Sequence, residues 1–216
     1  MLELLASTPR YVVCVKPVGV SAQDSGSESL PRMLAAQLDL DAVYPVHRLD
    51  QQVGGVMVYA KTAKAAADFS RYAAENGLKK TYLAVIRGCP EEPSGEWTDL
   101  LFHDRSRNKT YVVRRSRNGV KEARLAYRVL QQREEASLVQ VQLFTGRTHQ
   151  IRVQFSSRGF PLLGDGKYGS RDNRCTVALW SYRLEFEDEG MRHTFTAVPP
   201  AAYPWEQFSE YNGKSE

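Results

Sequence analysis

The sequence contains little cysteine and no long hydrophobic run. The three cysteines, Cys14, Cys89 and Cys175, are odd in number and widely spaced, so they form neither a disulfide framework nor a metal-binding pattern. This cysteine usage predicts a reducing, cytoplasmic compartment. No run of 18 apolar residues is present, which predicts that the chain does not cross a membrane. The first ten residues lack the basic and apolar regions of a secretory signal.

Several motifs that identify common enzyme classes are also missing. The chain has no phosphate-binding Walker loop, no dinucleotide fingerprint and no Gly-x-Ser-x-Gly elbow. His47 and His149 do not form an i, i+4 pair and have no evident third ligand, so we expect no metal. These absences argue against nucleotide-driven, redox and serine-hydrolase chemistry.

Positive charge is concentrated in one segment. Residues 105–128 contain nine Lys or Arg and a single acid, a net charge of +8, although the whole chain carries only +4. Such segregation offers a polyanion one preferred face, and it includes Arg114, Arg115 and Arg117. A solvated hairpin with bases placed for solubility would give the same pattern, so charge alone leaves both interpretations open.

Hydrophobic periodicity predicts mostly strands with a few helices, in one domain that spans residues 1–216 and is of ordinary size or has two lobes. Expected strands are residues 11–15, 53–60, 80–87, 138–144, 177–186 and 194–198, and expected helices are residues 31–40, 62–76 and 148–158. Within residues 105–128, Asn118-Gly119 predicts a hairpin turn between strands 111–115 and 124–130. Because strands and helices do not alternate regularly, we expect an α+β fold with a mixed, largely antiparallel sheet flanked by helices.

Two segments carry residues suited to chemistry. Asp50 ends His47-Arg48-Leu49-Asp50, just before a strand that starts with two glycines, where backbone can approach a ligand closely. Arg147 stands at a strand-to-helix turn, where free backbone N–H groups favour anions. Each has an ordinary alternative: Asp50 as a turn or capping residue, and Arg147 as a structural bridge between loops.

These segments resemble the motifs of the RluA-type pseudouridine synthases. The resembling segments, in the family's order over roughly residues 11–198, are Lys16-Pro17-Val18-Gly19, residues 47–62 with the His-Arg-Leu-Asp motif, residues 80–84, residues 146–152, residues 159–169 and residues 177–186. The resemblance implies a pseudouridine synthase fold with a central catalytic cleft. It also implies an RNA isomerase, which would need no cofactor because nothing is oxidised and no atom is gained.

By resemblance, Asp50 is the catalytic carboxylate, acting either as a nucleophile or as a base. Arg147 would pair with Asp50 and keep it ionised. Tyr82 would stack on the uracil and is a candidate for the later proton removal from carbon. Arg48 would fill the space that the flipped base vacates, and Leu179 would line the pocket beneath the ring.

The chain departs from the family pattern at two places. Val53-Gly54 replaces the usual Thr-Ser, and Trp180-Ser181 replaces the common His-Ala. The first departure lies beside the expected catalytic residue and motivates a second hypothesis, a catalytically impaired RNA-binding protein of the same fold. A third, a nucleoside or glycoside hydrolase, lacks a second acid in a comparable motif.

The resemblance begins directly at the catalytic domain, without the small N-terminal RNA-binding module of many relatives. Substrate grip would then come from the domain's own basic face. We expect a monomer whose partner is a stem-loop of rRNA or tRNA, a choice that loop shape governs.

Overall fold

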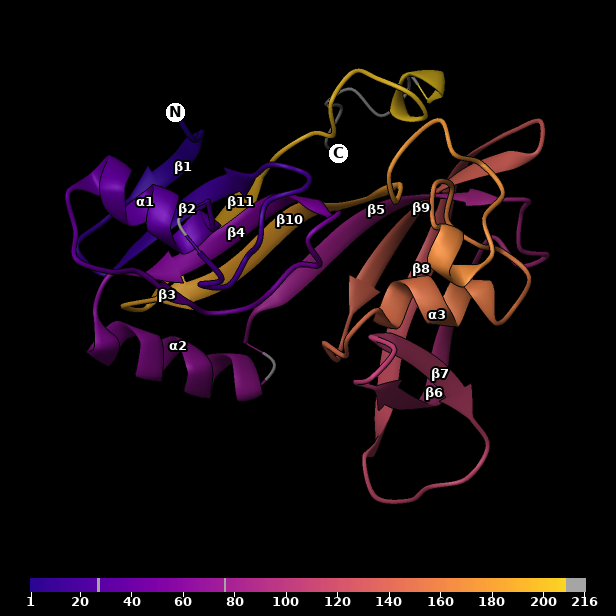
Figure 1. Cartoon of the computed structure of the whole chain (residues 1–216), viewed down its shortest axis with the longest axis horizontal. Coiled ribbons are helices and arrows are strands. Elements are labelled where there is room, and N and C mark those ends of the chain that lie inside the picture. Colours follow the sequence, from indigo (N-terminus) through magenta and orange to yellow (C-terminus); the bar gives the residue numbers. More distant parts are fainter. Residues whose placement is uncertain (27, 76, 209–216) are drawn as a thin grey trace. The chain divides into compact units, whose positions relative to one another are not determined.

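The computed structural model describes residues 1–26, 28–75 and 77–208, which fall into two compact units (Figure 1). The first unit comprises Met1–Lys80 and Trp180–Pro199, and the second comprises Thr81–Leu179 and Pro200–Glu216. Each unit contains both strands and helices. The sequence-based expectation of one domain over residues 1–216 stays a prediction.

The sheet of the first unit has the strand order β1-β2-β4-β10. These strands are β1 (Leu4–Ser7), β2 (Tyr11–Lys16), β4 (Gly54–Ala60) and β10 (Leu179–Asp188); the short β3 (Tyr44–Pro45) also pairs with β4, and β11 (Met191–Thr196) pairs with β10. The β4–β10 pairing is parallel and the others named here are antiparallel. All seven residues of β4 are buried, which makes it the central strand of this unit.

Helix α2 (Ala63–Ala74) covers one face of this sheet. Thr62 caps it, because its side-chain oxygen accepts a hydrogen bond from the Ala65 N–H at 3.1 Å. Its buried Ala65 and Phe69 pack with Tyr11 and other core residues of β2, β4 and β10, as the helical period predicts. The predicted end of this helix, Asn76, lies outside the described residues.

The opposite face of β4 is covered by the segment that leads into α1 (Leu30–Leu38). The buried Tyr59 hydroxyl donates to the Ala22 carbonyl at 2.7 Å, which fastens that segment to the sheet. Leu30 and Leu34 of α1 are fully buried. Core residues therefore lie on both faces of β4, and the strand leading out of the Asp50 loop has a fixed position within the first unit.

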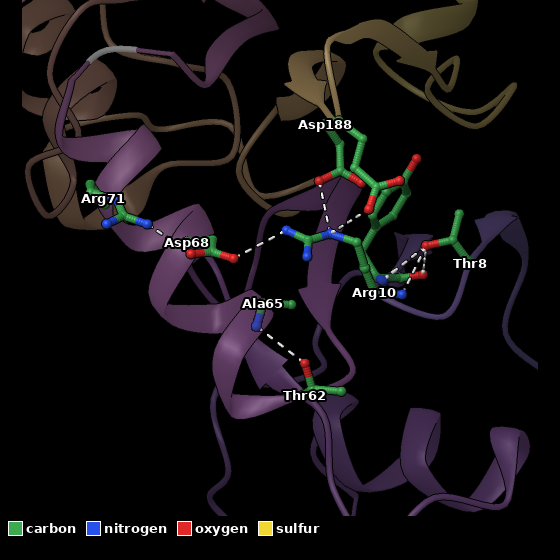
Figure 2. Close-up of polar contacts among 9 residues, drawn as sticks. Thr8, Arg10, Thr62, Ala65, Asp68, Arg71 and Asp188 are labelled. Carbon is green, nitrogen blue, oxygen red and sulfur yellow. Dashed lines mark hydrogen bonds and ion pairs between the residues drawn. The ribbon is translucent and has the colours of Figure 1, made fainter.

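Arg10 ties three elements of the first unit together (Figure 2). From the turn before β2, its Nε donates to Asp188 at 3.0 Å and its terminal nitrogen donates to Asp68 of α2 at 3.2 Å. Arg71, one helical turn further along α2, also donates to Asp68. Because the Arg10 side chain is 29% exposed, these ion pairs contribute modestly to stability.

The second unit has the strand order β5-β9-β8-β6-β7. Its elements are β5 (Lys79–Arg87), β6 (Ser94–Asp104), β7 (Lys109–Val113), β8 (Val120–Arg133), β9 (Ala136–Leu143), α3 (Gln150–Ser156) and two short 3₁₀ turns, η1 (Gly166–Tyr168) and η2 (Trp205–Gln207). Helix α3 packs on β6 and β7, where Phe155 joins Trp97 and Tyr127 in an aromatic cluster.

The predicted hairpin around Asn118-Gly119 is wrong in its pairing. The turn exists, since Val120 N–H donates to the Arg117 carbonyl, but β7 and β8 each pair with β6 instead of with each other. The actual hairpin is β6–β7, whose turn is closed by the Asp104 carboxylate accepting from the Ser106 and Arg107 N–H groups. Local turn chemistry is readable from the sequence, whereas the choice of partner strand depends on side-chain burial over the whole sheet.

The predicted fold class is confirmed. Each unit combines strands with helices, the strand pairings are largely antiparallel, and strands and helices do not alternate regularly. None of the described helices is long and apolar enough to cross a membrane.

Candidate active site

Asp50 lies in a tight turn at the entry to β4. The Val53 N–H donates to the Asp50 carbonyl at 3.0 Å and closes the turn. Its neighbour Leu49 is buried, Arg48 is exposed, and Asp50 itself is partly buried. The buried leucine therefore anchors the motif, while Arg48 is exposed to solvent.

The Lys16 side chain holds this turn in place. It is 0% exposed, and its Nζ donates to the carbonyls of Pro17 (2.8 Å), Val20 (2.6 Å) and Gln51 (3.0 Å). These three bonds match all three donors of an ammonium group. The Gly19 N–H also donates to the Gln51 carbonyl. Lys16 thus holds the backbone of the residue that directly follows Asp50.

Burial lowers the pKa of Lys16 to about 8, and the negative charge of Asp50 counteracts part of that effect. The Lys16 ammonium and the Asp50 carboxylate therefore interact electrostatically inside the first unit. Sequence analysis identified Lys16 only as part of a resembling motif and gave it no role.

His47 has a structural position rather than a metal-binding one. Its Nε2 accepts a hydrogen bond from the Val58 N–H of β4 at 3.3 Å, so the neutral ring carries its proton on Nδ1. Burial, together with the positive charge of Lys80, lowers the pKa of His47 to about 3. The imidazole is therefore neutral at physiological pH and attaches the start of the motif to the central strand.

Tyr82 and Leu179 belong to the second unit. Tyr82 lies on β5 and is 5% exposed, and Leu179 begins β10 and is 6% exposed. Nearby backbone is tightly bonded: the Val85 N–H donates to Ala178, and the Leu163 N–H donates to Val85. Both side chains are thus carried on rigid strand backbone. Their roles toward a nucleotide stay predictions.

Arg147 stands between β9 and α3, as the sequence predicts. Its Nε donates to the Glu122 carbonyl at 2.8 Å, and its N–H donates to the Gln150 side chain at 3.0 Å. The Thr145 hydroxyl bonds the same Gln150 oxygen. The Nε of the guanidinium therefore fixes the β8 backbone. Its assigned pairing with Asp50 stays a prediction.

A second arginine of the same motif escaped sequence analysis. Arg152 on α3 is 6% exposed and forms a two-pronged ion pair with Asp165, at 2.7 and 2.8 Å. Its guanidinium also lies over the Tyr168 ring, 5.1 Å from the centroid. Asp165 is 1% exposed. The sequence signal that could have predicted the burial of Arg152 is its position between the apolar residues Ile151 and Val153 of one short helix.

The tyrosine beneath Arg152 connects this ion pair to the rest of the second unit. The Tyr168 hydroxyl accepts from the Thr110 N–H at 2.8 Å and shares a hydrogen bond with His149 Nδ1 at 2.9 Å. His149, considered as a metal ligand from sequence, is therefore part of a hydrogen-bonded network under α3. The network holds the motif rigidly against β7.

The basic stretch, residues 105–128, lies on β7, β8 and their connecting loops. Some of its members are engaged: Arg124 pairs with Glu96 at 2.8 Å, and the Arg117 guanidinium stacks on Phe102. Arg114 and Arg115 are exposed in the β7–β8 loop and form no salt bridge within the part of the chain that the structure describes. Their charge is therefore available to an anionic partner.

Comparison with known proteins agrees with these features. Residues 10–157 match the family model described as RNA pseudouridylate synthase. A Haemophilus influenzae protein named as an uncharacterized RNA pseudouridine synthase is 28% identical, over 94% of this chain and 90% of its own length. The ribosomal large subunit pseudouridine synthase D of Nitrosomonas europaea is 34% identical over 78% of this chain, which spans 50% of that protein.

Among solved structures, the human RNA pseudouridylate synthase domain containing 1 superposes with a TM-score of 0.80 and 22% identity. It covers 94% of this chain and 85% of its own, and it shows a common fold. The family model covers more than half of the sequence and contains Asp50, Tyr82 and Arg147. The chain belongs to the RNA pseudouridylate synthase family, in the RluA-type branch that its motifs predicted, whose members are isomerases acting on RNA.

Proposed function

We propose that this protein converts a specific uridine of rRNA or tRNA into pseudouridine, with Asp50 as the catalytic carboxylate. The observation that carries the proposal is the construction of the Asp50 turn. A buried ammonium holds the backbone at Gln51, and a hydrogen bond from the Val53 N–H closes the turn that contains the partly buried Asp50. Such preorganisation is what a group needs when it must meet a reacting atom in a fixed geometry.

The reaction detaches uracil from ribose at nitrogen and rejoins it at carbon. Hydrolysis must be avoided, since a base lost to water cannot be reattached, and one carboxylate suits this better than the water-activating pair of a glycosidase. During cleavage, Asp50 acts on the ribose or on the uracil, either as a nucleophile or as a proton acceptor. Tyr82 stacks on the uracil and assists the later proton removal from carbon.

The remaining assignments concern charge and shape. Arg147 keeps Asp50 ionised, and Leu179 lines the space beneath the uracil. Arg48, exposed two residues before Asp50, fills the gap left when the target nucleotide leaves its stack. Extruding a base costs a few kcal/mol and least in a loop, so a stem-loop is the expected substrate.

Ribosomal RNA is the first substrate to test, because a relative of 34% identity is named for the large ribosomal subunit. We take the protein to act in the cytoplasm as a monomer. Light scattering behind a size-exclusion column tests the oligomeric state directly, and a dimer mass would correct that part of the proposal.

Tritium release from RNA transcripts labelled at carbon 5 of uridine tests the chemistry. The wild-type protein should release tritium, whereas Asp50→Asn should release none above background while keeping its RNA affinity. Asp41→Asn, at an exposed aspartate in the preceding loop, is the matched control and should behave like the wild type. Free uracil in the reaction would instead indicate a hydrolase, and RNA binding with no release by the wild type would indicate a non-catalytic protein.

The proposed RNA face is tested by reversing three charges. Replacing Arg114, Arg115 and Arg117 together with glutamate should weaken RNA binding and reduce the slope of log affinity against log salt by about 2–3, since each lost phosphate contact removes about 0.7–0.9. An unchanged slope would mean that the stretch is a solvated surface.

A matched control reverses three charges outside the stretch. Arg32 on α1 with Lys64 and Arg71 on α2 supply the same change in net charge. This second triple variant should keep the wild-type salt slope, because net charge alone does not place a cation against a phosphate.

A further inference from the structure

The two departures from the family pattern are neighbours in space. Gly54 opens β4, Trp180 lies near the start of β10, and these two residues are register partners in the parallel β4–β10 pairing. The next pair in register is Gly55 and Ser181. Substitutions that look unrelated in the sequence, 126 positions apart (180 minus 54), therefore meet on adjacent strands beside the Asp50 turn.

Gly54 is required by the size of Trp180. A Cβ placed on Gly54 would lie 2.4 Å from the indole Cζ3, 3.0 Å from Cε3 and 3.1 Å from the carbonyl oxygen of Lys16. The first of these contacts is far inside van der Waals separation. The backbone of Gly54 has no positive φ, so space and not conformational freedom explains this glycine.

The indole is held in its position. Its Nε1 donates to the Ala197 carbonyl at 2.8 Å, and the residue is only 7% exposed. A serine at position 54 could therefore not displace the ring without breaking that hydrogen bond or moving β4. The indole fills the space that a larger residue at 54 would occupy.

Gly55 differs from Gly54 and serves as an internal contrast. It has a φ of +115°, and an added Cβ would lie 2.2 Å from the backbone oxygen of Ser181. Backbone cannot be exchanged for a smaller group, so position 55 needs glycine whatever side chain stands at 181. Only position 54 faces a side chain, and only there can a smaller residue on one strand be matched by a larger one on the other.

Gly54 is also connected to the Asp50 turn. Val53 ends the turn and directly precedes Gly54, and its N–H donates to the Asp50 carbonyl. Lys16 touches both parts: its carbonyl lies against Gly54, and its ammonium bonds the carbonyl of Gln51. A shift at the start of β4 would therefore be transmitted to the turn through Val53 and Lys16.

We infer that Gly54 and Trp180 form a matched pair in which Trp180 is a positioning residue for the Asp50 turn. The indole sets where β4 begins, and β4 sets where the carboxylate stands. A larger residue at 54 would need a smaller side chain at 180. The glycine at 54 is thus explained by the packing of the indole against the start of β4.

A double-mutant cycle tests the pair with Gly54→Ser, Trp180→His and the combined variant. The inference rests on the proposed function, so tritium release and thermal unfolding are both measured. Gly54→Ser alone should lower kcat about tenfold or more with little change in KM, because a misplaced catalytic group loses rate and not RNA affinity. It should lower Tm by about 5 °C through overpacking.

The combined variant should recover most of what Gly54→Ser loses, in kcat and in Tm, because histidine vacates the space that serine needs. Strictly additive effects would overturn the inference. Recovery of Tm without recovery of kcat would overturn the positioning role. Gly166→Ser is the matched control, since a Cβ there meets nothing within 4 Å, and it should leave both quantities unchanged.

An inactive wild-type protein would overturn the proposed function and with it the positioning role. The unfolding cycle would still decide separately whether the two residues are coupled. An absence of coupling between Gly54 and Trp180 and an absence of catalysis by Asp50 therefore give different results.

Discussion

Substituting Lys16 with methionine should remove a pH-dependent part of the protein's stability. In the folded protein, burial lowers the pKa of Lys16 from 10.5 to about 8. In the unfolded chain the ammonium is hydrated and keeps its ordinary pKa. Between these two values the unfolded state binds more protons than the folded state, so the free energy of unfolding rises with pH in that window.

The magnitude follows from the shift. A difference of 2.5 pKa units corresponds to about 3 kcal/mol when the whole window is crossed, and about 2 kcal/mol of it develops between pH 7 and pH 9.5. Methionine has a similar length and no titrating group. The free energy of unfolding of the Lys16→Met variant should therefore lack this increase. The difference between wild type and Lys16→Met should grow by about 2 kcal/mol over the same pH range.

Urea titrations at several pH values between 7 and 9.5 measure this difference. Lys64→Met, at an exposed lysine on α2, is the matched control and should give a curve parallel to the wild type. Parallel curves for wild type and Lys16→Met would refute the reasoning, because they would mean that the buried ammonium has the same proton affinity in both states. Since Lys16 also holds the Gln51 carbonyl, the variant should lose kcat as well.

Three further predictions concern single contacts, each measured by urea unfolding at pH 7. Thr62→Ala should destabilise the protein by about 1 kcal/mol, because the Ala65 N–H loses its capping acceptor, whereas Thr62→Ser should be close to neutral. Arg10→Met should cost about 1 kcal/mol or less, since its ion pairs with Asp68 and Asp188 are partly exposed, and a larger loss would show that this arginine is a main staple of the first unit. Asp165→Asn should cost about 3–5 kcal/mol by breaking its buried ion pair with Arg152, and a loss below 1 kcal/mol would contradict that account.

Much of the fold could be predicted from local sequence signals. The cap at Thr62 and the buried stripe of α2 follow from residue type and helical period, and the strand that became β4 follows from its apolar run after two glycines. The pairing of β7 and β8 with β6 could not be read, because it depends on contacts between distant residues and not on the turn at Asn118-Gly119. Nearest-neighbour turn signals specify a reversal of the chain, but not the partner strand.

The candidate site shows the same division. Asp50 and Tyr82 stand out because their motifs are contiguous in sequence. Arg152 and Asp165 do not, because a buried ion pair between residues 13 positions apart appears only after α3 and the following loop have folded. The role of Gly54 needs the β4–β10 register, which brings Trp180 against it. Packing complementarity between strands distant in sequence is a three-dimensional property.

The central claim is that the carboxylate of Asp50 performs the isomerisation in RNA. Its most direct test is a transcriptome-wide map of pseudouridine in cells whose chromosomal copy carries Asp50→Asn, compared with the unaltered strain at equal protein level. We predict that at least one uridine of rRNA or tRNA loses its modification completely, and that purified wild-type protein restores it in the extracted RNA. An identical map in both strains, or restoration of the lost modification by the Asp50→Asn protein, would contradict the account.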